Sequence, residues 1–347
     1  MKQRLRRFWP FIKAFLAAAI LFAIGRRFWL DLRQHPEIWD VSLRPGPLIL
    51  AALSFVAGMT FFALYWIRLL KRLGQHPQFL PAMRAYFVGQ LGKYLPGKAW
   101  ALLMRTTLGS GPGVRLGLAA ATTFYEVLAT MSSGALVAAV VFFLFAPAHS
   151  TISDAEIWQS LVRLEASPNL ILGRRVLVAL AFLFLAPVGL PIIPPVFNRL
   201  VDRLSLPFRD KDADPFPQFT MSMLLEGLGI TLFGWILFGL STKWTIEALQ
   251  FGNVSWDWKQ SALLMGFVAL SYVAGFVIIV VPGGLGIREF LLTIFFVPHF
   301  SQTMGIEEAR GAAILTALVL RLIWTVSEVV IAGATYLFPA QNFDASP

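Results

Sequence analysis

Long apolar runs separated by short charged segments dominate this chain. A helix of about 20 apolar residues is long enough to cross the hydrocarbon core of a bilayer. The pattern therefore predicts an all-α, polytopic helical integral membrane protein with about seven or eight spans. The expected spans are Phe8–Gly25, Pro47–Ile67, Leu116–Phe145, Val176–Val196, Met221–Leu240, Ser261–Val281 and Ala312–Phe338.

Two stretches interrupt this pattern. In residues 79–108, short apolar segments flank the dipeptide Pro96-Gly97. Later, a long apolar run breaks at Pro282 and resumes as Phe290–Val297, which is too short to span. Non-helical backbone survives at membrane depth only where protein or a water-filled cavity satisfies its polar groups. We therefore predict two broken or re-entrant elements.

The two breaks bear on the organisation of the chain. Interrupted segments in corresponding positions of two halves point to a transporter site at the interface of an inverted repeat. The chain reads as a single membrane domain, 1–347, with possible halves 1–197 and 220–347 joined by a polar cytoplasmic linker, 198–219. The similarity between the breaks is short, so the sequence leaves open whether the halves form an internal inverted repeat.

Composition supports the membrane assignment. The chain is 57% hydrophobic and 14% charged, against about 25% charged residues in soluble domains. The net charge of +10 does not indicate nucleic acid, because Lys and Arg cluster at the ends of apolar runs. That placement fits the positive-inside rule and contact with anionic lipid headgroups, and it puts the N-terminus in the cytoplasm. If Gly286–Pro298 is re-entrant the C-terminus lies outside, and if this segment crosses fully it lies inside; the tail after Phe338 lacks Lys and Arg, which favours the exterior.

Several kinds of chemistry find no support in the sequence. The absence of cysteine excludes disulfides and thiolate sites, and the four histidines form no cluster. We therefore expect no metal and no cofactor. No phosphate-binding loop, zinc-protease or serine-hydrolase motif is present, so we expect no enzyme activity.

The first interrupted element carries candidate residues for a lipid headgroup. Cations there could bind a phosphate, helped by free N–H groups where a helix restarts after the break. The alternative is that these cations are anchors whose side chains reach back to the cytoplasmic surface. The candidates are Gln90, Lys93, Tyr94, Lys98, Trp100 and Arg105, with Pro96 and Gly97 forming the break.

The second interrupted element offers a glycine-rich turn beside two charges. Gly283, Gly284 and Gly286 allow backbone turns that leave N–H groups facing an anion, and Arg288 and Glu289 open the restarted helix. A tight interhelical turn that needs small residues is the alternative.

Three ionisable residues lie inside predicted spans: Glu126, Arg321 and Glu328. Such groups are costly in hydrocarbon, so they usually face the bundle interior and pair with one another. An Arg321–Glu126 or Arg321–Glu328 pair could form a gate, a proton-coupling element or part of a headgroup cavity. A purely structural ion pair is equally compatible with the sequence.

These residues resemble the membrane domain of the lysylphosphatidylglycerol synthase family, a flippase-like module that also occurs alone. The matching pieces are Gln90–Trp100 with Arg105, then Glu126, Pro282–Glu289 and Arg321, in order over essentially the whole chain. Full-length synthases carry a soluble domain that transfers an amino acid from aminoacyl-tRNA to phosphatidylglycerol. Only nine residues follow Phe338, so we expect the stand-alone form without synthase activity.

The sequence thus favours a lipid translocase of the bacterial inner membrane that handles an anionic phospholipid or lipid-linked precursor. One alternative is a membrane partner that presents a lipid to a separate synthase or glycosyltransferase. A membrane-embedded enzyme using Glu126 or Glu289 as a base has weaker support. The expected partners are membrane lipids with anionic headgroups, and no nucleic acid. The sequence does not specify the oligomeric state.

Overall fold

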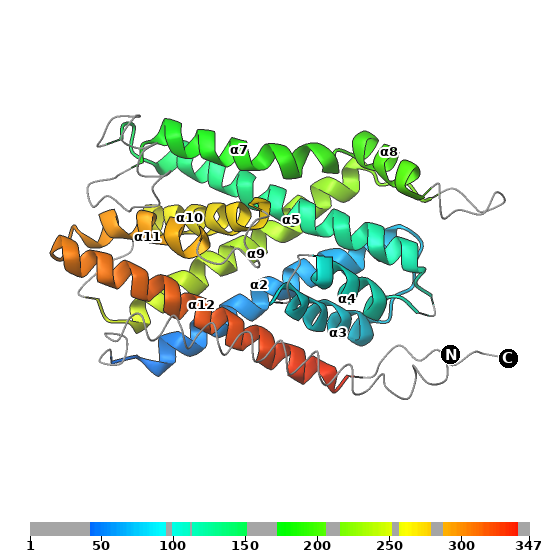
Figure 1. The fold of residues 1–347 in the computed structure, drawn as a ribbon, viewed down its shortest axis with the longest axis horizontal. Helices are drawn as coiled ribbons and strands as arrows, with labels where there is room; N and C mark the ends of the chain where they lie inside the picture. Colours follow the sequence, from blue (N-terminus) through cyan, green and yellow to red (C-terminus); the bar gives the residue numbers. More distant parts are fainter. Residues whose placement is uncertain are drawn as a thin grey trace.

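A computed structural model describes residues 42–94, 99–111, 113–150, 172–205, 216–251, 257–278 and 287–338. Within these ranges the chain is helical and contains no strand, which confirms the predicted all-α fold. The α-helices, labelled in Figure 1, are α2 (Pro45–Arg72), α3 (Phe79–Gln90), α4 (Ala99–Gly109), α5 (Leu116–Phe145), α7 (Arg174–Ile192), α8 (Pro194–Ser205), α9 (Met221–Ala248), α10 (Trp258–Val277), α11 (Ile287–Phe300) and α12 (Ile306–Tyr336). A 3₁₀ turn, η2 (Leu91–Tyr94), follows α3.

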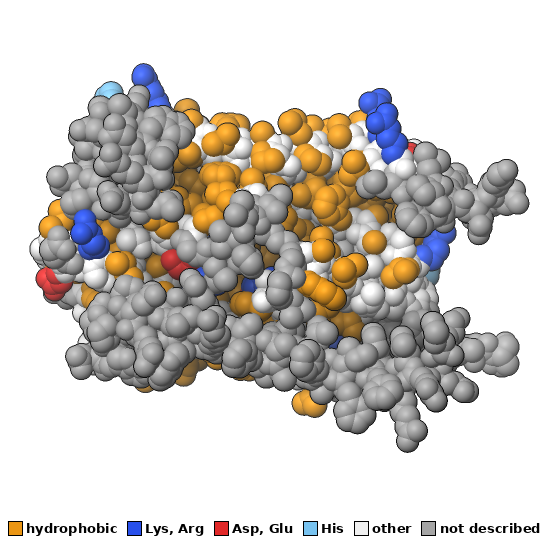
Figure 2. Space-filling view, viewed as in Figure 1, with side chains coloured by type: hydrophobic (Ala, Val, Ile, Leu, Met, Phe, Trp, Pro, Cys, Tyr) orange, Lys and Arg blue, Asp and Glu red, His pale blue; other side chains and the backbone are white. Residues whose placement is uncertain are grey.

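Six helices of the described ranges are long and apolar enough to cross a membrane: α2, α5, α7, α9, α10 and α12. They coincide with the predicted spans, except that the first, Phe8–Gly25, lies outside the described residues. Large apolar side chains stay exposed on these helices; Leu53, Phe143 and Leu225 are each about 60% exposed. On the face shown in Figure 2, hydrophobic side chains cover the middle and most visible Lys and Arg lie toward the two ends. A surface of this kind is solvated by lipid, so the protein is a multi-pass membrane protein.

The predicted linker overlaps a helix. The expected linker 198–219 begins inside α8, which follows α7 after a single residue and has Pro194 at its first position. Proline is favoured there because the first N–H of a helix has no intrahelical partner. Phe197 is buried while Arg199 and Arg203 are exposed. The polar composition therefore belongs to the exposed face of an amphipathic helix. Residues 206–215 lie outside the described ranges.

The centre of the bundle is the antiparallel pair α2 and α9. The N–H of Arg44 donates to the carbonyl of Ala248 at 3.0 Å, so the start of α2 meets the end of α9. Glycines allow the close approach: an added Cβ at Gly58 would lie 2.7 Å from Phe238, and one at Gly234 would lie 2.2 Å from Phe62. Ring contacts between α2 and α9 fill the remaining space.

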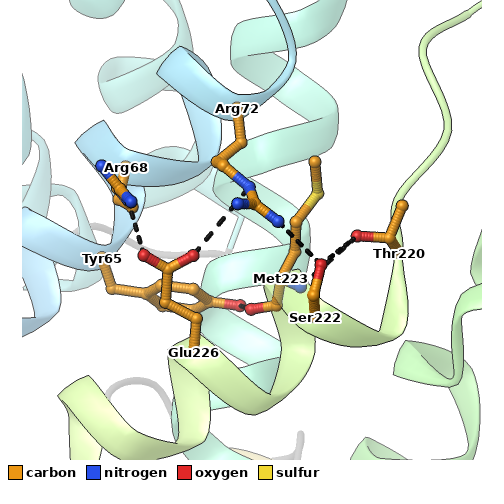
Figure 3. A network of polar contacts seen from close by, with 7 residues as sticks. All are labelled: Tyr65, Arg68, Arg72, Thr220, Ser222, Met223 and Glu226. Atoms are coloured by element: carbon orange, nitrogen blue, oxygen red, sulfur yellow. Dashed lines mark hydrogen bonds and ion pairs between the residues drawn. The ribbon is translucent and has the colours of Figure 1, made fainter.

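A polar network fastens the other end of the same helix pair (Figure 3). Arg68 donates to Glu226 at 2.6 Å, and Arg72 lies 3.9 Å from the second carboxylate oxygen. Arg72 also donates to Ser222 at 2.7 Å. Glu226 therefore links α9 to α2 at the surface.

Helices α3 and α4 form an antiparallel hairpin. Gly92 faces the backbone of Ala101, and Gly89 faces that of Arg105. The N–H of His76, before α3, donates to the carbonyl of Gly113, after α4, so both ends of the hairpin meet. A helix of 12 residues is about 18 Å long, too short to cross. This first hairpin therefore enters and leaves on the face where α2 ends. Its predicted break, 96–97, lies outside the described residues.

Helices α10 and α11 form a second antiparallel hairpin. Phe267 stacks on Phe295 with ring centroids 4.2 Å apart, and Gly275 faces the side chain of Arg288. The end of α11 returns to the face where α9 ends, because the rings of Phe251 and Phe300 are in contact. The two hairpins thus enter from opposite faces, and each lies between two long helices (Figure 1). Residues 279–286, which contain the second predicted break, lie outside the described residues.

The side of the C-terminal helix end differs from the expectation. We expected the C-terminus on the exterior face, opposite the basic end of α2. Instead, Arg84 of the first hairpin donates to the carbonyl of Phe338 at 2.8 Å and covers the ring of Tyr336. Helix α12 therefore ends on the same face as α2. The expectation failed because α11 runs back beside α10 to the face where α9 ends, so α12 then leads to the face where α2 ends.

Candidate functional site

The two hairpins meet long helices α5 and α12 around two neighbouring cavities. The larger measures about 440 Å³ and the smaller about 40 Å³. Both are lined by Lys93 from the first hairpin and by Tyr272 and Arg288 from the second. The two hairpins, which are far apart in sequence, thus contribute to one region. We call these two cavities and their lining the central site.

A buried ion pair joins the first hairpin to α5. Arg105 donates to Glu126, and both side chains are about 2% exposed. Glu126 also accepts hydrogen bonds from the Tyr86 hydroxyl at 3.2 Å and the Thr130 hydroxyl at 3.1 Å. The Arg105 guanidinium lies 4.1 Å from the centre of the Tyr86 ring. Two charges in hydrocarbon are compensated here by each other and by polar neighbours.

A second ion pair joins the tip of the first hairpin to α12. Lys93 donates to Glu328, whose side chain is 2% exposed. The Tyr94 hydroxyl lies 2.8 Å from the other oxygen of Glu328 and 3.0 Å from the hydroxyl of Thr325. The Lys93 side chain is 20% exposed. Lys93 is therefore the member of this pair that other molecules can reach.

A third ion pair lies within the second half of the chain, where Arg321 of α12 donates to Glu289 of α11. The sequence suggested Arg321–Glu126 or Arg321–Glu328, and both suggestions are wrong. Arg321 and Glu328 are two helical turns apart, about 10 Å along the axis. Each therefore pairs across to a different hairpin.

Arg288 differs from the other cations. Its guanidinium lies over the ring of Tyr272, 3.6 Å from the centroid, a cation–π contact. Within the described ranges it makes no ion pair with a carboxylate, and its Nε has no hydrogen-bond partner. The described site contains four cations and three carboxylates, and the three carboxylates are used by the other cations. Among its described residues, the central site therefore has one more cation than carboxylates, and the cation without a carboxylate partner is Arg288.

The larger cavity combines this charge with an apolar wall. Beside Lys93, Arg105, Glu126 and Arg288, its lining is mostly apolar. The apolar side chains come from five helices, and examples are Phe62 of α2, Leu102 of α4, Met131 of α5, Val188 of α7 and Phe276 of α10. A cavity with charge at one part and apolar side chains elsewhere suits an amphiphile with an anionic group.

The remaining predicted residues divide into three groups. Gln90 lines the larger cavity, and Glu289, Arg321 and Glu328 line the smaller one. Trp100 is 42% exposed on α4 and lines neither cavity. The third group lies outside the described residues and consists of Pro96, Gly97, Lys98, Pro282, Gly283, Gly284 and Gly286.

Sequence reasoning missed the aromatic partners of the charges. Tyr86 contacts both Arg105 and Glu126. The ring of Tyr272 makes the cation–π contact with the guanidinium of Arg288. A tyrosine in the middle of an apolar helix was the available signal, because a buried hydroxyl needs a partner.

Comparisons with known proteins add no assignment. No protein-family model matches the chain, and no curated protein matches it. Among the described residues, no group of three or more His, Asp or Glu side chains could hold a metal ion. What the site can do must therefore be argued from its own geometry.

Proposed function

We propose that this protein is a lipid translocase that moves an anionic phospholipid or lipid-linked precursor across the membrane. The proposal rests on one observation: a central cavity with an apolar wall and a surplus positive charge at Arg288. An anionic headgroup supplies the missing negative charge, and its acyl chains match the apolar side chains of α4, α5 and α7. A soluble anion would gain nothing from that wall.

The two opposed hairpins support translocation in addition to binding. Each approaches the central site from a different face and leaves on that same face. Transporters with inverted repeats alternate access around a site of this kind. Within the halves 1–197 and 220–347, the described segments 45–145 and 221–336 then follow one plan: a long helix, a hairpin of shorter helices and another long helix. Helix α7 and the start of α8 are additional to this plan in the first half.

The proposal also draws on the resemblance to the membrane domain of the lysylphosphatidylglycerol synthase family. It places the protein in the bacterial inner membrane with the N-terminus and the basic end of α2 in the cytoplasm. The work of the protein is then transport, with no covalent chemistry and no cofactor. Presentation of a lipid to a separate enzyme is the outcome if lipid binds but does not move.

Proteoliposomes test the proposal. Vesicles containing the purified protein and a trace of fluorescent phosphatidylglycerol are treated with dithionite, which destroys only outer-leaflet fluorescence. We expect the protected half of the signal to decay faster with wild-type protein than in empty vesicles or with Arg288→Met. The control is Arg203→Met, an exposed cation on α8, which should behave like wild type. Equal decay in protein-containing and empty vesicles would overturn translocation.

A further inference from the structure

Lys93 holds a double position in the central site. It lines both cavities, and at the same time it is the ion-pair partner of Glu328. Arg288 lines the same two cavities, so two positive charges face one space. An anion placed between Lys93 and Arg288 would therefore be attracted by both and would relieve their repulsion.

The other two ion pairs are less open to exchange. Arg105 is buried to the same extent as Glu126. Arg321 lies in the middle of a 31-residue helix and binds Glu289 on the adjacent helix. Lys93 instead belongs to a four-residue 3₁₀ turn at the tip of a hairpin. Its ammonium is a compact charge on a flexible stem, which can turn from one anion to another.

Turning Lys93 toward a bound anion would change the surroundings of Glu328. From η2, Glu328 is faced by Lys93 and Tyr94, and only the Tyr94 hydroxyl would remain as a donor. The charged and titratable groups of the neighbouring elements in the smaller cavity are Arg321 on its own helix, Arg288 and Glu289 on α11, and Tyr272 on α10. Arg321 is held by Glu289, and Arg288 would face the incoming anion. A buried carboxylate left without its cation favours the protonated form.

We propose that binding of an anionic headgroup at Lys93 and Arg288 displaces Glu328, which then takes up one proton from water. Transport of the anion would be accompanied by a proton, and a proton gradient could drive it. When the anion leaves, Lys93 returns to Glu328 and the proton is released. This inference rests on the proposed function and names its coupling ion.

Calorimetry in buffers of different ionisation enthalpy counts the protons taken up on binding. The probe is dihexanoyl-phosphatidylglycerol at pH 7, titrated into the detergent-solubilised protein. Its phosphodiester does not titrate near this pH, so a proton that is taken up must go to the protein. The apparent binding enthalpy plotted against buffer ionisation enthalpy has a slope equal to the number of protons. We expect a slope of about one for wild type, and an affinity that weakens roughly tenfold per pH unit over the pH range in which one proton is taken up on binding.

Two variants and a second probe sharpen the test. Glu328→Gln should bind with a slope of zero and without the pH dependence, while Glu226→Gln, a surface carboxylate, should keep the wild-type slope. Dimethyl phosphate has the same charged group without acyl chains. If dimethyl phosphate binds with the uptake of one proton, the proton coupling stands and the lipid assignment of the proposed function fails. Lipid binding with a wild-type slope of zero would overturn the coupling alone. Binding of neither probe would overturn both.

Discussion

The buried pair of Arg105 and Glu126 gives the sharpest prediction about stability. We expect Arg105→Met and Glu126→Leu each to destabilise the protein by about 3–5 kcal/mol, because each leaves an uncompensated charge among side chains that are 2% exposed. Glu126→Leu should lie at the upper end, since a guanidinium cannot lose its proton and Tyr86 and Thr130 also lose their acceptor. In the double variant no charge remains, so the cost should fall well below the sum of the single costs.

Reversible unfolding in mixed detergent–SDS micelles measures these free energies. The control is Lys243→Met, which breaks a surface pair with Glu247 on one helix and should cost about 0.3–0.5 kcal/mol. Additive single effects, within about 0.5 kcal/mol, would refute the reasoning.

Three further predictions concern packing, protonation and topology. Gly234→Ala should destabilise the protein by about 1–3 kcal/mol, because the added methyl group forces α2 and α9 apart. Gly229→Ala on the same helix should be neutral or stabilising, because nothing lies within 4 Å of the added Cβ. Thermal unfolding of the two variants measures the difference. Burial lowers the pKa of His299, at the surface end of α11, below its ordinary value of 6.5. The stability of the protein should therefore be full above pH 6.5 and should decline as the pH falls toward that lowered pKa. An equal decline in the stability of a His299→Gln variant would contradict this. The chain has no cysteine, so single cysteines can be introduced as labels. Cysteines at Gln78 and Thr303, which flank different hairpins, should react with an impermeant maleimide from opposite faces of the membrane. Reaction of both from the same face would refute the opposed orientation of the hairpins.

The spans were predictable because hydropathy reflects a strong constraint. Every backbone polar group in hydrocarbon must be satisfied, so a long apolar run such as Leu116–Phe145 has little choice but a spanning helix, and its predicted bounds agree with α5. The topology of the last third was less predictable. Whether the apolar run of α10 crosses completely depends on the packing of Phe267 on Phe295 in the next helix, and single-sequence hydropathy contains no information about that contact.

The candidate site, too, could be predicted from the sequence only in part. Sequence reasoning selected the charged residues, because intramembrane charges are rare and costly. Their pairing was not accessible, since Lys93 and Glu328 are 235 positions apart and both suggested partners of Arg321 were wrong. The spacing of two residues along one helix says little about a partner that arrives from a hairpin on the opposite side of the bundle.

The central claim is that the surplus charge at Arg288 makes this cavity a site for anionic lipid. Native mass spectrometry of protein purified in mild detergent tests it most directly. We expect wild type to retain an anionic phospholipid class selectively over zwitterionic lipid, and we expect Arg288→Met to lose that selectivity while Arg203→Met keeps it. Selective retention that is unchanged in Arg288→Met, or no selective retention by the wild type, would contradict the account.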